Sequence, residues 1–479
     1  TMEQSDMSSI KFGTSGWRGI IAEDFTYEAV RIVTQSIADY LKAYHEDKKG
    51  IVVGYDARFM GDRFASEVVR ILAGNNIKSF LSIGPAPTPA ISFEIIRRKA
   101  GGGINITASH NPPEYNGLKF SSPSGGPALP AVTREIEQKA NEMLLEVAYS
   151  ELSMADARQK NLLEEIEPFH FYAEGLRQKI DMAVIKKAQL EIGVDLMYGA
   201  GRGYLDRILK DAGCNITVFH NHTDPSFGGR PPDPSEENLA ALIKAVKENG
   251  CDLGLALDGD ADRFGIIDRD GAFIEPNYIL AMLFDYMIRV KGLSGGVARS
   301  VATSHLSDAV ARHYNMPVYE TPVGFKYIGE LITTGKILIG GEESAGISIR
   351  GHVPEKDGIL TCLLVTEMVA REGKSLKELL NDLYKRVGRL VSKRENVRLD
   401  NVSRKGMSHM LNTSPKTIAG LSVKDAKDIG GVKFLLEHGC WLLIRESGTE
   451  PVVRLYGEAR DEDELERIMK AGREMALGK

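Results

Sequence analysis

Apolar residues along the chain fall repeatedly into short, β-branched runs, each followed by a small-residue turn, an amphipathic stretch and a second apolar run. Three units of this kind follow one another, each with a strand, a helix and a second strand. The first lies at 51–55, 63–74 and 79–83, the second at 190–196, 204–212 and 216–219, and the third at 296–302, 306–314 and 318–319. This order is typical of βαβ units, so we expect three α/β domains of related architecture.

The last hundred residues follow a different pattern. Two apolar runs, 441–444 and 452–456, flank a polar loop, and a charged helical stretch over 462–475 closes the chain. This arrangement predicts a small α+β domain with an antiparallel sheet. A stretch rich in Glu, Gln and Lys, from about residue 140 to 167, predicts a solvated helix that links the first two domains.

The length of 479 residues exceeds what one ordinary hydrophobic core supports. At roughly 150 residues per domain this length suggests three or four domains. The three α/β units and the different C-terminal pattern lead us to expect four, at 1–155, 156–272, 273–385 and 386–479. The net charge of −6 argues against broad polyanion binding, so no nucleic-acid partner is expected and any phosphate contact must be local.

Two classes of protein are disfavoured by what the sequence lacks. No apolar run reaches the roughly 18 to 20 residues that a membrane span needs. The four cysteines are scattered without a Cys-x-x-Cys pair, which indicates neither a disulfide framework nor a zinc site. Both observations fit a protein of the reducing cytoplasm.

A run of small residues, Thr107 to Pro112, follows the apolar segment 104–106 and presents one hydroxyl, that of Ser109. A serine in such a turn is ordinarily a backbone cap. The hypothesis that Ser109 is reactive depends on three distant loops, 258–263, 341–346 and 445–451, which offer the complementary chemistry.

The first of these loops carries three carboxylates, Asp258, Asp260 and Asp262, directly after the apolar strand 253–257. Extended geometry would put all three on one side, where they would repel one another without a cation. A small set of hard oxygen ligands favours Mg²⁺. A calcium loop is excluded by spacing, because its sixth and twelfth positions would be arginines instead of Gly and Glu. The alternative is a solvated acidic turn that binds nothing.

A phosphoserine at Ser109 would add negative charge and three acceptor oxygens, and would be a natural fourth ligand for that cation. Arg263, next to the aspartate loop, could stabilise the transferred group. No Gly-x-Ser-x-Gly surrounds Ser109, which excludes a nucleophile elbow. The glycines after the strand 190–196 lack the third glycine of a dinucleotide fingerprint, since that position is Tyr204.

The loop 445–451 concentrates one guanidinium, two hydroxyls and a glycine, with a further arginine on the following strand: Arg445, Ser447, Gly448, Thr449 and Arg454. Such a turn can hold a phosphate dianion, although a polar hairpin turn has a similar composition. The loop 341–346 offers Glu342 and Ser344 between small residues, a donor and acceptor set that suits sugar hydroxyls. An N-cap region is the alternative for that loop.

All four loops occur in the order found in the α-D-phosphohexomutases, and the opening Phe12-Gly13-Thr14-Ser15-Gly16-Trp17-Arg18-Gly19 resembles the amino-terminal signature of that superfamily. The resemblance covers essentially the whole chain and is greatest to phosphoglucomutase and phosphomannomutase. It implies an α/β fold of four domains in a heart-shaped arrangement, three related α/β domains with mixed sheets plus a C-terminal α+β domain.

The resemblance also implies roles for individual residues. Ser109 would be the phosphoserine, and it would bind Mg²⁺ together with Asp258, Asp260 and Asp262. Sugar hydroxyls would be read by Glu342 and Ser344, the non-reacting phosphate would be held by Arg445, Ser447, Gly448 and Thr449 with Arg454, and Arg18 and Lys119 would be active-site cations. Lys119 is the first candidate for the general acid and base, with His110 and Lys326 behind it. Some family members carry a histidine where this chain has Phe325, while the segment 323–327 resembles the phosphoglucomutase branch.

The implied reaction converts glucose 1-phosphate to glucose 6-phosphate, with glucose 1,6-bisphosphate as intermediate and activator. The alternative is a dual phosphomannomutase/phosphoglucomutase, because both hexoses share the O3 and O4 configuration. A phosphoglucosamine mutase is less favoured, since that type usually has Gln before the serine of the sugar loop. A non-catalytic sugar-phosphate sensor and a metal-dependent phosphatase are the alternatives from other classes. The expected partner is a small hexose phosphate, and the protein is expected to be a monomer or homodimer.

Overall fold

The computed structural model describes residues 9–398, 415–446 and 452–477. The chain divides into two compact units. The first comprises Thr1–Pro276, Phe325–Gly340 and Ser344–Lys377, and the second comprises Asn277–Gly324, Gly341–Glu343 and Glu378–Lys479.

The first unit opens with a seven-stranded mixed sheet. In spatial order its strands are β1 (Phe12–Gly13), β2 (Gly16–Ile20), β6 (Tyr115–Ser121), β5 (Gly103–Ile106), β3 (Ile51–Tyr55), β4 (Ser79–Ser82) and β7 (Leu163–Ile166). The four strands β5, β3, β4 and β7 run parallel, and β6, β2 and β1 continue the sheet in antiparallel pairs. The first predicted βαβ unit is therefore confirmed.

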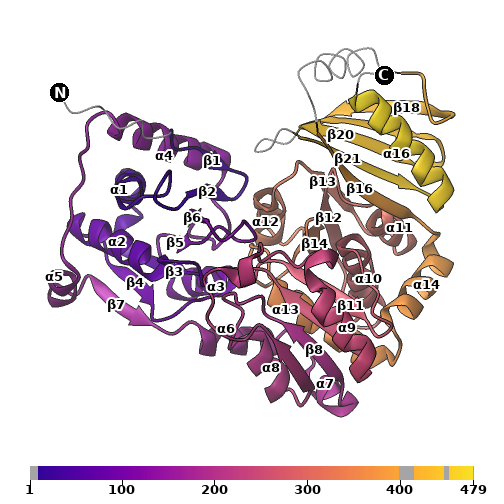
Figure 1. The fold of residues 1–479 in the computed structure, drawn as a ribbon, viewed down its shortest axis with the longest axis horizontal. Coiled ribbons are helices and arrows are strands. Elements are labelled where there is room, and N and C mark those ends of the chain that lie inside the picture. The colour runs from indigo at the N-terminus through magenta and orange to yellow at the C-terminus, as the bar shows by residue number, and fades with distance from the viewer. Residues whose placement is uncertain (1–8, 399–414, 447–451, 478–479) are drawn as a thin grey trace. The chain divides into compact units, whose positions relative to one another are not determined.

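Helices cover both faces of this sheet, as the continuous apolar runs of its core strands require. They are α1 (Tyr27–Ala43), α2 (Gly61–Gly74), α3 (Thr88–Arg98) and α4 (Pro130–Met143). Ile51 and Val53 face the core shared with α1, α2 and α4, whereas Val52 faces Ile91 and Ile95 of α3. Figure 1 shows α1 and α4 on the opposite side of the strands from α3.

The polar stretch after α4 differs from the prediction of a solvated linking helix, which is wrong over most of its length. A short helix, α5 (Met154–Gln159), is followed by β7, which pairs in parallel with β4 and extends the first sheet. Ile166 is buried against the α3 side, and Glu164 forms ion pairs with Lys78 and Arg98 at 2.8 and 2.9 Å. An edge strand tolerates this polar composition because only part of it must be buried.

A second mixed sheet follows in the first unit, in the order β11 (Phe264–Asp268), β10 (Leu253–Leu257), β8 (Glu191–Asp195) and β9 (Asn215–Phe219). Helices α8 (Leu205–Asp211) and α9 (Ala240–Asn249) pack against this sheet, while the preceding α6 (Phe169–Arg177) contacts α3 and α7 (Met182–Ala188) contacts the later helix over Gly358–Glu372. Strand β10 is buried throughout and ends one residue before Asp258. The second predicted βαβ unit is confirmed, and the sheet delivers the aspartate loop at the carboxyl end of a core strand.

Three further elements belong to the first unit: α12 (Phe325–Thr333), β15 (Gly346–Ile349) and α13 (Gly358–Glu372). Helix α13 packs against β10 and β11. Three elements contain residues of both units: α10 (Pro276–Arg289), β14 (Ile337–Glu342) and α14 (Leu376–Val387).

The second unit begins with the third predicted βαβ unit, which is also confirmed. Strands β12 (Gly296–Ser300) and β13 (Val318–Thr321) are parallel and are joined through α11 (Leu306–His313). The last residue of β12 and the turn that leads from it to α11 form the segment 300–305, named the turn 300–305.

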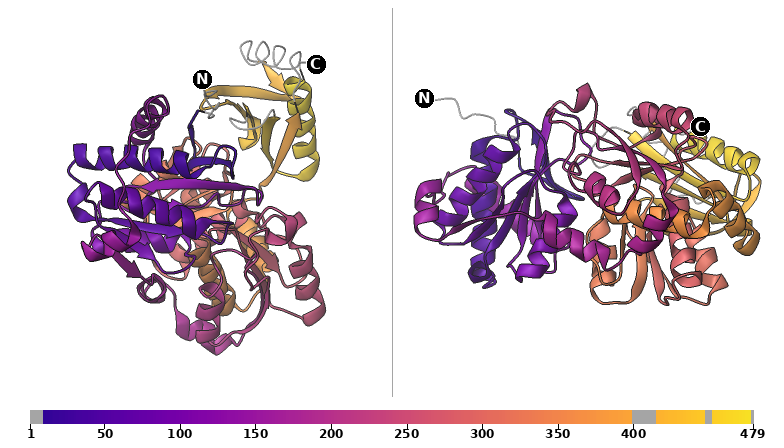
Figure 2. Two further views of the ribbon diagram at one scale, coloured as in Figure 1. Left: turned by 60° about the vertical axis from the view of Figure 1, so that its left-hand side comes forward. Right: turned by 90° about the horizontal axis from the view of Figure 1, so that it is seen from below.

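The C-terminal part of the second unit is a six-stranded antiparallel sheet, which confirms the predicted α+β domain. Its order is β16 (Val391–Arg398), β21 (Val452–Ala459), β20 (Trp441–Glu446), β19 (Val432–Leu436), β18 (Leu421–Asp428) and β17 (Thr417–Ile418). Helix α16 (Glu462–Ala476) lies along one face (Figures 1 and 2). The packing is close, because a Cβ on Gly457 would lie 2.6 Å from the sulfur of Met469.

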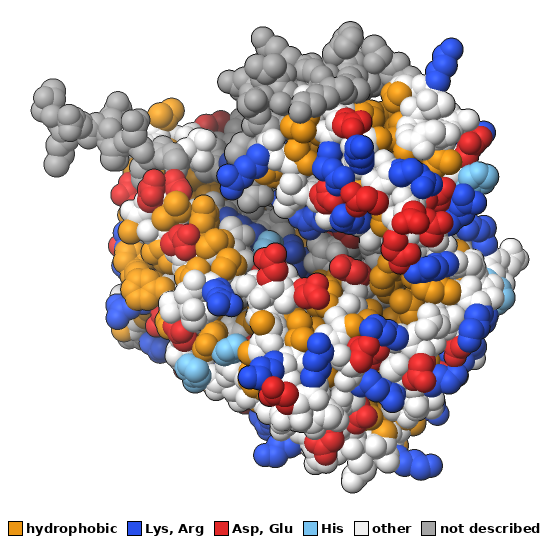
Figure 3. Space-filling view, turned by 45° about the vertical axis from the view of Figure 1, so that its right-hand side comes forward, with side chains coloured by type: hydrophobic (Ala, Val, Ile, Leu, Met, Phe, Trp, Pro, Cys, Tyr) orange, Lys and Arg blue, Asp and Glu red, His pale blue; other side chains and the backbone are white. Residues whose placement is uncertain are grey.

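Basic and acidic side chains are intermixed over the face drawn in Figure 3, in keeping with the modest net charge of −6. Within the described residues, no helix combines the length and the apolar character that a membrane crossing requires.

Candidate active site

The serine loop and the aspartate loop meet in the first unit. Ser109 follows β5 and is 1% exposed, and its Oγ donates a hydrogen bond to Asp258 Oδ2 at 2.7 Å. A Cβ on Gly259 would lie 2.5 Å from the carbonyl oxygen of Ser109, so only glycine permits this approach of the two backbones. Two loops that lie about 150 positions apart in the sequence are thereby joined through one hydroxyl.

The backbone of Ser109 is held in a conformation that a serine seldom adopts. Its φ is 54°, in the left-handed region. The buried guanidinium of Arg58 donates to four carbonyl oxygens of the loop: Ser109 at 2.8 Å, Asn111 at 2.5 Å, Pro112 at 2.8 Å and Tyr115 at 2.9 Å. A planar fork with several donors is suited to fixing such a loop, and these bonds offset the backbone strain.

Asp56 also stabilises the serine loop, through hydrogen bonds from Arg58 and Thr107. One of its carboxylate oxygens accepts from the Arg58 amide at 2.9 Å, and the other accepts from Thr107 Oγ1 at 2.5 Å. Thr107 Oγ1 in turn accepts from the Ser109 amide at 2.9 Å. Burial raises the pKa of Asp56 to about 6, against the opposing effect of Arg58. Sequence reasoning missed Asp56 and Arg58, although a charged pair directly after the buried strand β3 was the available signal.

The three aspartates converge as expected, but for a different reason. Oxygens of Asp258, Asp260 and Asp262 lie within 4.8 Å of one another, and all three residues are buried. The segment is a tight turn, with a left-handed Ala261 at φ 59°, so the prediction of extended alternation is wrong. Burial and the neighbouring carboxylates raise the pKa of Asp258 well above its usual range. Such a cluster requires cations to remain ionised.

The donor set fits a divalent cation. Among the described residues, Asp260 Oδ1 and Asp262 Oδ1 are buried without any hydrogen-bond partner. Orphaned carboxylate oxygens beside a serine hydroxyl are hard ligands, which suit Mg²⁺ better than a soft metal. The triad can therefore hold a metal ion.

Two lysines share these carboxylates. Lys119 Nζ, from β6, lies 2.6 Å from Asp260 and 2.8 Å from Asp262, and Lys356 Nζ lies 3.0 Å from Asp262. Burial alone would lower the pKa of Lys119, but Asp260 and Asp262 outweigh it and raise the pKa. Sequence reasoning missed Lys356, because it stands in the short charged run before α13 with no spacing pattern to mark it.

Two further basic side chains, those of Arg18 and His110, face the serine loop. Arg18, from β2, donates to the side chain of Asn111, and burial together with Arg263 lowers its pKa to about 10. His110 Nδ1 lies 3.4 Å from Ser109 Oγ. Burial and the nearby Arg263 and Arg18 lower the pKa of His110 well below its usual value, so its imidazole is neutral at pH 7. Buried positive charge of this kind suits a phosphoryl group.

Lys326, on α12, lies in the neighbourhood where it was expected. It lines a small cavity together with Lys119, Glu355 and the amino-terminal segment Phe12 to Gly16. Its helix therefore delivers a further amine to the neighbourhood of Lys119.

The loop 341–346, the predicted sugar loop, begins at the end of β14. The carboxylate of Glu342 is buried and accepts from the Gly324 amide at 2.7 Å. Two residues further on, Ser344 is partly exposed, and it precedes Ala345 at φ 67°. The loop is thus a tight turn in which one acceptor is already oriented by the backbone of the segment before α12.

The loop 445–451, the predicted phosphate loop, is described only in part, because Ser447, Gly448 and Thr449 lie outside the described residues. The strands at its base place Arg445 of β20 directly opposite Arg454 of β21. Like charges at directly opposed positions destabilise a sheet. Their presence at the base of this hairpin favours an anion-binding role for both.

Most of the chain matches the four domain descriptions of one family. Residues 9–145 match phosphoglucomutase/phosphomannomutase alpha/beta/alpha domain I, 170–271 match domain II, 275–387 match domain III, and 396–475 match the C-terminal domain.

Individual relatives agree. A phosphoglucomutase/phosphomannomutase of Thermococcus kodakarensis is 31% identical, over 96% of this chain and 97% of its own. A phosphoglucomutase of Komagataeibacter xylinus is 30% identical (94% and 87% covered), as is a phosphoglucosamine mutase of Prochlorococcus marinus (96% of each). The crystal structure of the Paramecium exocytosis-sensitive phosphoprotein pp63/parafusin, a phosphoglucomutase in its open form, aligns with a TM-score of 0.85 at 25% identity, covering 98% of this chain and 96% of that one.

Three α/β domains with mixed sheets, a C-terminal antiparallel domain and the loops that they carry define a phosphohexomutase, an isomerase that moves a phosphoryl group within a hexose phosphate. The chain belongs to the phosphoglucomutase/phosphomannomutase family of the α-D-phosphohexomutase superfamily. The resemblance inferred from its four loops is confirmed.

Proposed function

We propose that this chain is a phosphoglucomutase, which interconverts glucose 1-phosphate and glucose 6-phosphate through a phosphorylated Ser109. The observation that carries the proposal is the position of the Ser109 hydroxyl, 2.7 Å from Asp258 within a buried cluster of carboxylates, lysines and arginines. A hydroxyl in that position can carry a phosphoryl group whose charge the surrounding cations offset.

The chemistry has two balanced halves. In the first, the bond between phosphorus and Ser109 Oγ breaks while a bond to O6 of glucose 1-phosphate forms; the O6 proton passes to a base, and Oγ regains a proton. The resulting 1,6-bisphosphate turns around. In the second half the Ser109 Oγ proton passes to a base while Oγ bonds to the phosphorus on O1; the bond between that phosphorus and O1 breaks, O1 gains a proton, and glucose 6-phosphate leaves. No phosphate is consumed, and added glucose 1,6-bisphosphate would act as an activator by rephosphorylating Ser109.

The triad Asp258, Asp260 and Asp262 would hold Mg²⁺, with an oxygen on Ser109 completing the set. A bound Mg²⁺ withdraws charge from the transferring phosphoryl group. The remaining stabilisation comes from the chain itself, since Arg18 and Arg263 face the serine loop and neutral His110 lies beside Oγ.

Proton transfer is assigned first to Lys119. Its ammonium is held between Asp260 and Asp262, and the raised pKa keeps it protonated and able to donate. The partner for the opposite step is one of three side chains, His110, Lys326 or Lys356. Lys356 is added by the geometry, because its Nζ shares Asp262 with Lys119.

In both bound orientations the sugar hydroxyls and the non-reacting phosphate must be held. We assign these two contacts to separate loops. Glu342 and Ser344 would read the sugar hydroxyls. Arg445 and Arg454, with Ser447, Gly448 and Thr449 of the loop between them, would hold whichever phosphate is not reacting. One phosphate grip can therefore serve a single reactive serine in both halves of the reaction.

Glucose is favoured by the residue before Ser344, which is Glu343 instead of the glutamine usual in phosphoglucosamine mutases. Dual action on mannose and glucose phosphates is the second candidate, and it is supported by the combined name of the Thermococcus kodakarensis relative.

Phosphoryl transfer from radiolabelled glucose 1,6-bisphosphate tests the proposal. We expect label on Ser109 and its loss when unlabelled glucose 1-phosphate is added, with less than a few per cent released as inorganic phosphate. Label released mainly as free phosphate would instead establish a phosphatase. Initial rates with mannose 1-phosphate equal to those with glucose 1-phosphate would establish the dual enzyme.

A further inference from the structure

The second carboxylate of the sugar loop, Glu343, is turned toward the turn after β12. Its Oε2 accepts from Ser300 Oγ at 2.9 Å and from Thr303 Oγ1 at 3.1 Å, and its amide donates to Thr303 Oγ1 at 3.2 Å. Ser300 and Thr303 are 0% and 1% exposed. Two buried hydroxyls thus fix both the backbone and the side chain of the residue next to Glu342.

The same turn is seated on the C-terminal sheet by apolar packing. Val301 and Ala302 form one buried cluster with Trp441, Leu443 and Tyr456, which belong to β20 and β21. Burial of this cluster stabilises the contact in proportion to the apolar area that it removes from water. All of these residues belong to the second unit.

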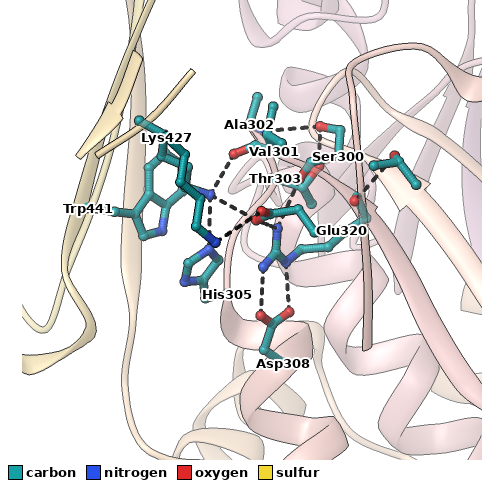
Figure 4. A network of polar contacts seen from close by, with 12 residues as sticks. Ser300, Val301, Ala302, Thr303, His305, Asp308, Glu320, Lys427 and Trp441 are labelled. Carbon is teal, nitrogen blue, oxygen red and sulfur yellow. Dashed lines mark hydrogen bonds and ion pairs between the residues drawn. The ribbon is translucent and has the colours of Figure 1, made fainter. Parts of the chain in front are cut away.

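A buried lysine of the C-terminal sheet also holds the turn, through hydrogen bonds. Lys433 Nζ, from β19, donates to the Val301 carbonyl at 2.7 Å and to His305 Nε2 at 3.0 Å. The ammonium also lies 4.1 Å from the centre of the Trp441 ring. Figure 4 shows His305 and Trp441 side by side at this contact, with Glu320 on the other side of the network.

A carboxylate of the sheet holds the end of the turn. Glu458 of β21 accepts from Ser304 Oγ, from the His305 amide at 2.9 Å and from Trp441 Nε1 at 2.8 Å. Each of three adjacent strands therefore contributes one side chain, Lys433, Trp441 or Glu458, to the fixation of residues 300–305. Strand β20 then runs into the phosphate loop at Arg445 and Glu446.

We propose that the turn 300–305 is a positioning element that couples the sugar loop to the C-terminal sheet. Glu343 and Thr303 are positioning residues, which act through the orientation of Glu342. Lys433 acts one step further away, because it fixes the turn on which Thr303 stands. This inference rests on the proposed function, since it assumes that Glu342 reads the hydroxyls of a hexose phosphate.

Replacement of Thr303 separates positioning from a general effect on folding. Thr303→Val keeps the shape but removes the hydroxyl that faces Glu343, and Thr303→Ser restores that hydroxyl. We expect the KM for glucose 1-phosphate to rise about tenfold in Thr303→Val, with kcat within about twofold and near-normal KM in Thr303→Ser. Inhibition by inorganic phosphate, which has no sugar hydroxyls, should change less than about twofold.

Thr366→Val is the matched control. Thr366 is equally buried, in α13, and its hydroxyl donates only to the Cys362 carbonyl at 2.8 Å. We expect its KM to equal that of the wild type. If Thr303→Val fails to fold by circular dichroism, Glu343→Ala removes the other end of the same contact at a partly exposed position, and the same tenfold rise is expected.

Coupling to the sheet is tested by the double variant Thr303→Val/Lys433→Met. If both residues act through one turn, Lys433→Met alone raises KM about tenfold, and the double variant stays near tenfold instead of reaching the product of about a hundredfold. A product of the two effects, or an unchanged KM in Thr303→Val, overturns the inference while the wild type still turns over. A wild type that isomerises no hexose phosphate overturns the proposed function, and the inference with it.

Discussion

Ser109 combines a strained backbone with burial, and that combination supports its proposed role more strongly than its sequence context does. Strain of this kind costs on the order of 1–3 kcal/mol and persists only where surrounding contacts enforce it. Arg58 and Thr107 provide those contacts in this chain. The arrangement holds Oγ on the aspartate triad before any substrate arrives.

Removal of the hydroxyl should abolish catalysis without loss of binding. In Ser109→Ala we expect the turnover number to fall at least about 10³-fold, because the phosphoryl carrier is lost. Ser36→Ala is the control, since Ser36 is buried in α1 and its hydroxyl contacts the Ile32 carbonyl at 3.0 Å and Met143 Sδ at 3.7 Å, away from the serine loop. Calorimetric titration should show that Ser109→Ala still binds glucose 1-phosphate; turnover near the wild-type value would remove Ser109 from the mechanism.

Asp56 should give the protein a measurable pH dependence of stability. Burial raises its pKa from 3.8 to about 6, so the folded state binds a proton more tightly than the unfolded state does. The stabilisation is complete below pH 4 and is lost as the pH rises through 6. A shift of that size corresponds to about 3 kcal/mol.

Denaturant unfolding of the wild type and of Asp56→Asn between pH 4 and pH 7 measures this effect. We expect the wild type to lose stability relative to the variant as the pH rises, by up to about 3 kcal/mol. Parallel curves over that interval would show that Asp56 is not the titrating group.

At the scale of elements, three clustered carboxylates make the aspartate loop better suited to a bound cation than to stability without one. With metal removed by chelation, Asp258→Asn should be at least as stable as the wild type, because one of three mutually repelling buried carboxylates is gone. Added Mg²⁺ should raise the melting temperature of the wild type by several degrees and that of the variant by much less. The opposite order in either condition would contradict a metal site at the triad.

The hairpin formed by β20 and β21 also loses stability through residues that are proposed to bind the ligand. Arg445 and Arg454 are directly opposed, a repulsion that costs about 0.2–1 kcal/mol in a sheet. Arg454→Gln should therefore leave the melting temperature unchanged or slightly higher, while the KM for glucose 1-phosphate rises at least about tenfold through the loss of a charge-assisted contact to phosphate. A variant that loses stability and keeps its KM would show that Arg454 is structural.

At the scale of the whole molecule, the sequence predicted most of the fold because its core strands are continuous apolar runs. Strands β3, β8 and β12 begin and end within about two residues of the predicted positions. Strand β7 was missed because Glu164 and Glu165 resemble a solvated helix, and only its pairing with β4 makes it a strand. Local pattern carries no information on such a non-local partner.

The same distinction explains which site residues could be found. Ser109 and the three aspartates lie in compact loops whose composition is unusual in itself. Lys356 and Thr303 are single residues in ordinary surroundings, and the fold alone places them beside Asp262 and Glu343. Arg58 belongs to the charged pair after β3, but its bonds to the carbonyl oxygens of the serine loop also follow only from the fold. Residues that support a site are therefore the part that sequence reasoning finds last.

A ³¹P NMR time course is the sharpest test of the proposal that the chain isomerises glucose phosphates. Glucose 1-phosphate and mannose 1-phosphate are incubated in one tube with Mg²⁺ and a trace of glucose 1,6-bisphosphate. We expect the glucose 1-phosphate resonance to be converted to that of glucose 6-phosphate, while the mannose resonance changes much more slowly and inorganic phosphate stays near zero. Faster conversion of mannose 1-phosphate, or no conversion of either sugar phosphate, would contradict this account.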